Sequence, residues 1–118
     1  MAVIAVVVVN LAFSAASGVT VTEIHWFGSN PCGGLSGSTT GGFRGAEGGV
    51  EKYTVTGLVN PNSTQSCTIG SIQSMVPGFT VQSGSFPLVI PAEGTTNLTV
   101  TIGLPGTEYD ADLSLLVE

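Results

Sequence analysis

Short runs of alternating apolar and polar residues recur between residue 19 and residue 118. Examples are VTVTEIHW, EKYTVTGLV and NLTVTIGL, and turn-forming sequences such as NPNST and PAEG separate the runs. Alternation with period two is typical of strands with one buried face, and turns roughly every eight to twelve residues are typical of a sandwich. The sequence therefore predicts a mainly β fold, in which residues 19–118 form a sandwich of about seven strands.

Two of the predicted strands have an irregular pattern. In VTVTEIHW, strict alternation places Ile24 on the face opposite Val19 and Val21, but the alternation fails near Glu23. Such a break indicates a β-bulge or a crossing into a second sheet. In EKYTVTGLV, Gly57 interrupts the alternation in the same way.

A glycine-rich stretch, FGSNPCGGLSGSTTGGFRGAEGG, separates these two predicted strands. It contains too few large apolar side chains to form a core strand pair, because glycine contributes no side chain to a packed face. We therefore expect a long excursion between the strands, with Phe43 as its main anchor to the core.

The first eighteen residues, MAVIAVVVVNLAFSAASG, contain only three polar side chains. Exposing about ten medium or large apolar side chains to water forfeits on the order of 15–25 kcal/mol, more than the net stability of about 5–15 kcal/mol of a whole domain. The segment must therefore be sheltered in lipid, in a partner or in the chain's own sandwich. We expect the contact to be made by Val3, Ile4, Val6, Val7, Val8, Val9, Leu11 and Phe13.

This leading segment can be read as a helix or as a strand. In a helix, Asn10, Ser14 and Ser17 fall on one polar stripe, and Gly18 stands where a left-handed residue ends a helix. In a strand, alternate residues from Val7 to Phe13 share one face. We favour a hydrophobic helix over residues 1–18, followed by the β domain over residues 19–118. A secretory signal is disfavoured because no basic residue precedes the run.

Charge and cysteine content restrict the partners and the cellular compartment that the chain can have. Two basic residues stand against eight acidic ones, for a net charge of −6, which argues against nucleic acid and anionic lipid as partners. Cys32 and Cys67 lie beside turn sequences and indicate a disulfide formed in an oxidising compartment, the alternative being two unpaired small residues. Asn62 and Asn97 begin N-glycosylation triplets, NST and NLT.

Residues that carry chemistry are sparse. His25 is the single histidine, so a metal site built on two histidines is excluded, and a structural role in its strand is expected. Glu108, Asp110 and Asp112 have the alternate spacing of Ca²⁺ ligands, although such acids are more often the solvated tip of a hairpin. No serine stands in a Gly-x-Ser-x-Gly motif. The sequence therefore predicts no enzyme activity, no metal site and no cofactor.

Two resemblances suggest a function. The segments SCTIGSI, GFTVQSG and IPAEGTTNLTVTIGL resemble immunoglobulin-like modules of archaeal surface proteins, over roughly residues 19–118. An apolar segment at residues 1–17, joined directly to VTVTEIHW, resembles archaeal type IV pilins, although it is short for that family. The resemblance implies that the leading helices bundle in the core of an extracellular filament and that the β domains face outward.

A filament subunit of this kind has itself as its main partner, in a helical homopolymer, and contacts the membrane only before assembly. Adhesion would add surface glycans or other cells as partners. Two alternatives remain open. The leading segment could be a strand donated to the next subunit of a thread, or it could anchor a ligand-binding module in the membrane.

Overall fold

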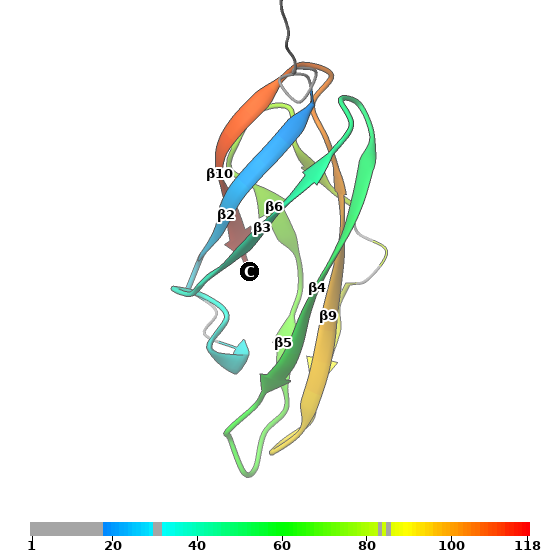
Figure 1. Cartoon of the computed structure of the whole chain (residues 1–118). Coiled ribbons are helices and arrows are strands. Elements are labelled where there is room, and N and C mark those ends of the chain that lie inside the picture. Colours follow the sequence, from blue (N-terminus) through cyan, green and yellow to red (C-terminus); the bar gives the residue numbers. More distant parts are fainter. Residues whose placement is uncertain (1–17, 30–31, 83, 85) are drawn as a thin grey trace, which may run out of the picture.

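The computed structural model describes residues 18–29, 32–82, 84 and 86–118 (Figure 1). Nine strands and one short 3₁₀ helix lie within these ranges. The strands are β2 (Val19–Phe27), β3 (Thr39–Gly45), β4 (Val50–Val59), β5 (Cys67–Ile69), β6 (Ile72–Ser74), β7 (Thr80–Val81), β8 (Leu88–Ile90), β9 (Thr95–Gly103) and β10 (Tyr109–Val117), and the helix η2 spans Cys32–Gly34. The prediction of a mainly β fold is confirmed.

The strands form a four-stranded sheet, a three-stranded sheet and a separate strand pair. The order is β3-β2-β10-β6 in the first sheet and β4-β9-β7 in the second, and β5 pairs with β8. All pairs are antiparallel except β2 and β10, which run parallel along their whole length. Figure 1 shows β2 and β10 beside each other, with β4 and β9 forming a second long ribbon.

One hydrophobic core joins the two larger sheets. Alternate side chains of β2 and β10 in the first sheet, and of β9 in the second, are almost completely buried. Their alternate positions point inward, as the period of two requires. The largest of the fully buried side chains are Trp26, Ile24, Leu35, Ile69, Ile90, Leu98, Ile102, Leu113 and Leu115.

A β-bulge interrupts β2 near Glu23, as the sequence indicated. Val21 pairs with Ala111 and Ile24 pairs with Leu113, so that two residues of β2 lie opposite one residue of β10. The two residues of the bulge, Thr22 and Glu23, are both exposed, and Ile24 is buried on the same side as Val21. Strict alternation placed Ile24 on the wrong face, because a bulge of one residue shifts the phase of everything that follows it.

The glycine-rich stretch contains a strand that the sequence analysis missed. Residues Thr39–Gly45 form β3, which pairs with β2 at the edge of the first sheet. Phe43 is partly buried against the core and is the anchor that was expected. An edge strand needs few apolar side chains, because its stability comes largely from the backbone hydrogen bonds to its neighbour.

A close backbone approach explains one of the glycines in β3. A Cβ on Gly42 would lie 1.7 Å from the carbonyl oxygen of Val21 and 2.6 Å from that of Thr22. The neighbouring Gly41 has no atom within 4 Å of such a Cβ. Gly42 therefore lets β3 pass directly over the β2 bulge, where any side chain would collide with backbone.

The predicted helix over residues 1–18, and with it the residues expected to drive polymerisation, lies outside the described residues except for Gly18. Within the part of the chain that is described, no helix has the length and hydrophobicity needed to span a bilayer. Gly18 has a φ of 131° and leads directly into β2.

Candidate functional site

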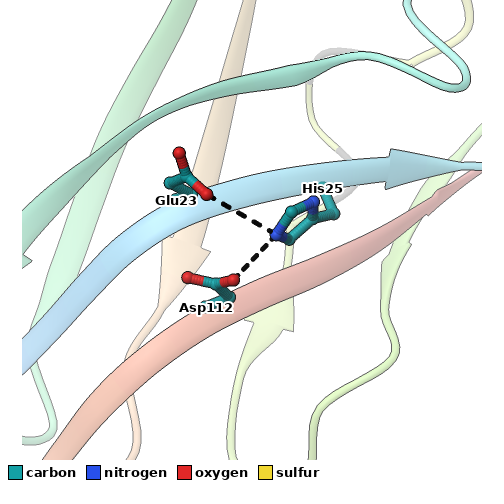
Figure 2. Close-up of side chains that lie close together, drawn as sticks. All are labelled: Glu23, His25 and Asp112. Carbon is teal, nitrogen blue, oxygen red and sulfur yellow. Dashed lines mark hydrogen bonds and ion pairs between the residues drawn. The ribbon is translucent and has the colours of Figure 1, made fainter.

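Three side chains with metal-binding or acid–base chemistry converge on the first sheet (Figure 2). Glu23 and His25 come from β2, and Asp112 comes from β10. His25 Nε2 lies 2.8 Å from Asp112 Oδ2 and 3.9 Å from Glu23 Oε1. Figure 2 shows the two carboxylates pointing at the same ring nitrogen. We refer to these three residues as the β2–β10 cluster.

The β2 bulge positions this cluster. Its two residues, Thr22 and Glu23, lie opposite Asp112, and both contribute to holding the Asp112 carboxylate. The Thr22 hydroxyl donates a hydrogen bond to Asp112 Oδ1, and the backbone N–H of Glu23 is also directed at this carboxylate. The hydrogen bonds from Thr22 and His25 lower the pKa of Asp112 below its ordinary value, because they favour the ionised form. Asp112 is therefore held in one orientation by hydrogen bonds that favour its ionised form.

The other ring nitrogen of His25 contacts the neighbouring strand β3. His25 Nδ1 lies 3.2 Å from Thr39 Oγ1, and His25 and Thr39 are paired in the sheet register. With its two nitrogens directed at different partners, the imidazole is held in one orientation. The side chains of Glu23, His25 and Asp112 are 56%, 34% and 46% exposed, so the cluster is open to solvent.

The sequence analysis identified only part of this cluster. It considered His25 and Asp112 separately, the latter with Glu108 and Asp110 as a possible Ca²⁺ site. Among the described residues, Asp112 is the member of that acidic trio that joins a group of potential ligands. Glu23 was treated only as a break in a strand, although its spacing of two from His25 was a signal that both could share a polar face.

The two cysteines are joined, as predicted. The Cys32–Cys67 disulfide connects η2 to the first residue of β5, with Cα atoms 5.8 Å apart. Closing a loop of 35 residues is worth roughly 3–4 kcal/mol in the chain-entropy model. The disulfide therefore ties down the excursion between β2 and β3.

Both glycosylation triplets lie at one end of the domain. Asn62 is exposed in the β4–β5 connection, and Asn97 is exposed at the start of β9. These regions contact each other, because Val59 pairs with Thr95 and Glu93 N–H donates to Asn62 O. In Figure 1 this end is at the bottom, and the start of β2 is at the top.

Comparison with known proteins does not add to this geometry. No protein-family model matches the chain. No curated protein matches it, and no solved structure does so. The function is therefore argued from the residues themselves.

Proposed function

We propose that this chain is a structural subunit of an extracellular filament, similar to an archaeal type IV pilin. Its leading segment, residues 1–17, packs with other copies in the filament core, and its β domain forms the outer layer. The proposal depends chiefly on the hydropathy of that segment, whose exposure would cost more than one domain's net stability. Self-association is the simplest way for a chain with this leading segment to remain in an aqueous setting.

The two ends of the β domain differ in a way that supports placing the leading segment inside the filament. The segment joins the domain at Gly18, next to the pairing of Val19 with Gly45 and Tyr109. Asn62 and Asn97 lie at the opposite end of the long β4–β9 ribbon. Sugars attached there would project away from a core formed by residues 1–17. The disulfide is consistent with an oxidising, extracellular setting.

We also propose that the β domain belongs to the immunoglobulin-like class of sandwiches. Support comes from the shared core of the two larger sheets and from the parallel pairing of β2 with β10. Counting β5 with β6 and β7 with β8 as single interrupted strands gives seven strands in the described residues. Strands that switch between sheets are frequent at the corners of such sandwiches.

A charge placed in the leading segment tests the proposed function. Val7→Asp and Val9→Asp should each abolish filaments of the full chain, because a carboxylate buried in an apolar core costs several kcal/mol per subunit. Assembly is measured by sedimentation velocity and by electron microscopy of detergent-free samples. The matched control is Val89→Asp, since Val89 is a valine of β8 that is 52% exposed; this variant should assemble normally.

Two results would contradict the filament proposal. One is assembly of the Val7→Asp variant to the same extent as the unaltered chain. The other is an unaltered chain that remains monomeric without detergent and sediments only with lipid vesicles, which would support the membrane-anchored binding module instead.

The donor-strand arrangement is a second candidate, favoured by the open edges of the sheets. Among the described residues, β4 pairs only with β9 and therefore forms one edge of its sheet. Val50 and Val59, at the two ends of β4, are 59% and 48% exposed. A strand from another copy could add to this edge by backbone hydrogen bonding. Amide hydrogen exchange in β4 distinguishes the two arrangements, because strand addition would protect its outward amides on assembly.

A further inference from the structure

We propose that Glu23, His25 and Asp112 form a binding site for a divalent transition-metal ion such as Zn²⁺. The three potential ligand atoms lie within 4.8 Å of one another. They come from two strands that are adjacent in the sheet, so the backbone holds them together before any ion binds. This site is independent of the leading segment and of the proposed assembly.

The distances between ligand atoms are close to those that zinc requires. With zinc–ligand bonds of about 2.0–2.2 Å, neighbouring ligand atoms are separated by about 3–3.5 Å. The separation of 2.8 Å between His25 Nε2 and Asp112 Oδ2 is slightly short, and that of 3.9 Å between His25 Nε2 and Glu23 Oε1 is slightly long. The third pair, Glu23 and Asp112, lies within 4.8 Å. All three side chains are partly exposed, so each has room to adjust when an ion binds.

Neighbouring residues orient two of the proposed ligands, Asp112 and His25, through hydrogen bonds. Hydrogen bonds from the Thr22 hydroxyl and from the backbone of Glu23 fix the orientation of the Asp112 carboxylate. Thr39 Oγ1 is placed to accept the proton of His25 Nδ1. In the ion-free cluster Nε2 carries the proton that it donates to Asp112 Oδ2. Zn²⁺ would displace that proton to solvent, and Nδ1 would then carry the ring proton and donate it to Thr39 Oγ1. An outer hydrogen bond to the second imidazole nitrogen is the usual arrangement for a metal-binding histidine.

The ligand set indicates the class of ion. Ca²⁺ and Mg²⁺ prefer oxygen ligands only, whereas an imidazole nitrogen with carboxylate oxygens suits Zn²⁺ and its neighbours in the first transition row. Two carboxylates neutralise the charge of a divalent ion. Three protein ligands leave at least one coordination position for water or for a group from another molecule, since the cluster is open to solvent.

Calorimetric titration of the full chain with ZnCl₂ tests the site. We expect saturable binding of one ion per chain that is unchanged by a large excess of CaCl₂ or MgCl₂. Asp112→Asn and His25→Gln should each weaken Zn²⁺ binding at least about tenfold, since each removes a ligand. The matched control is Asp110→Asn, which removes the same charge from the same strand outside the cluster and should change the affinity less than about twofold.

A nitrogen NMR spectrum of the His25 ring provides a second readout. Zn²⁺ should shift the Nε2 signal strongly and the Nδ1 signal weakly, which general charge attraction would not do. Any of four results would overturn the proposal: no saturable binding of Zn²⁺, displacement of Zn²⁺ by Ca²⁺, equal effects of Asp110→Asn and Asp112→Asn, or unchanged affinity in His25→Gln.

Discussion

At the scale of single residues, Asn60 is the buried polar side chain of the described domain. Its Nδ2 group donates hydrogen bonds to the carbonyl oxygens of Gln65 and Ile90, at 2.9 and 3.1 Å, and its Oδ1 accepts one from the Asn62 N–H. Asn60 thus connects the end of β4 to the β4–β5 connection and to β8. These bonds satisfy backbone groups that burial would otherwise leave without partners.

Replacing Asn60 by alanine should lower the free energy of unfolding by about 2–3 kcal/mol, because the buried carbonyl group of Ile90 loses this donor and the Asn60 network is removed. Urea denaturation followed by the fluorescence of Trp26, the single tryptophan, measures the change. Ser63→Ala, an exposed substitution in the same connection, is the control and should stay within about 0.5 kcal/mol. Equal stability of Asn60→Ala and the control would show that the Asn60 network contributes nothing.

The role of a residue was predictable where neighbouring residues in the sequence determine it. It was not predictable where the role depends on contacts with distant parts of the chain. The cysteine pair followed from residue type and turn context. Asn60 was hidden in a turn sequence, because nothing in NPNST shows that its first residue is buried. His25 and Asp112 are 87 positions apart and meet only because β2 and β10 pair in parallel. No local pattern shows that pairing.

At the scale of elements, the β2 bulge and β3 depend on each other. The bulge turns Thr22 and Glu23 outward and keeps Ile24 in the core. Because Gly42 has no side chain, the carbonyl groups of Val21 and Thr22 can occupy the space beside it. The same bulge places its two residues against Asp112. The shape of the β2–β10 cluster is therefore determined partly by a glycine on a third strand.

Gly42→Ala should destabilise the domain by about 2–3 kcal/mol, because the added methyl group meets backbone that must move. It should also shift the NMR signals of His25 by disturbing the bulge. Gly41→Ala adds the same methyl group in open space and is the matched control. Comparable urea midpoints for the two variants would refute the close approach of β3 to the bulge.

The predictability of each strand follows from its side chains. The long strands β4, β9 and β10 carry alternating apolar residues between turn sequences, so the alternation predicted them, including the Gly57 irregularity that shifts the register of β4. The short strands β5 to β8 have only two or three residues each, too few for alternation to fix their bounds. β3 was missed because an edge strand rich in glycine has almost no apolar pattern. The break near Glu23 was recognised, with a β-bulge as one of its two interpretations. Its effect on Ile24 could not be derived, because the sequence does not show how many residues of β2 lie opposite one residue of β10.

At the scale of the whole molecule, the β domain has one end that receives the leading segment and one end that carries both glycosylation triplets. Its disulfide is consistent with an oxidising, extracellular setting. The composition of residues 1–17 predicts that the segment is sheltered from water, and the proposed function assigns that shelter to other copies of the chain. Assembly through that segment is the central claim.

The most direct test is cryo-electron microscopy of the assembled full chain. The map should place residues 1–17 of every subunit packed together along the filament axis, with Asn62 and Asn97 at the outer surface. A map in which residues 1–17 lie at the periphery in contact with water, or a sample that contains only single dissolved chains, would contradict the account.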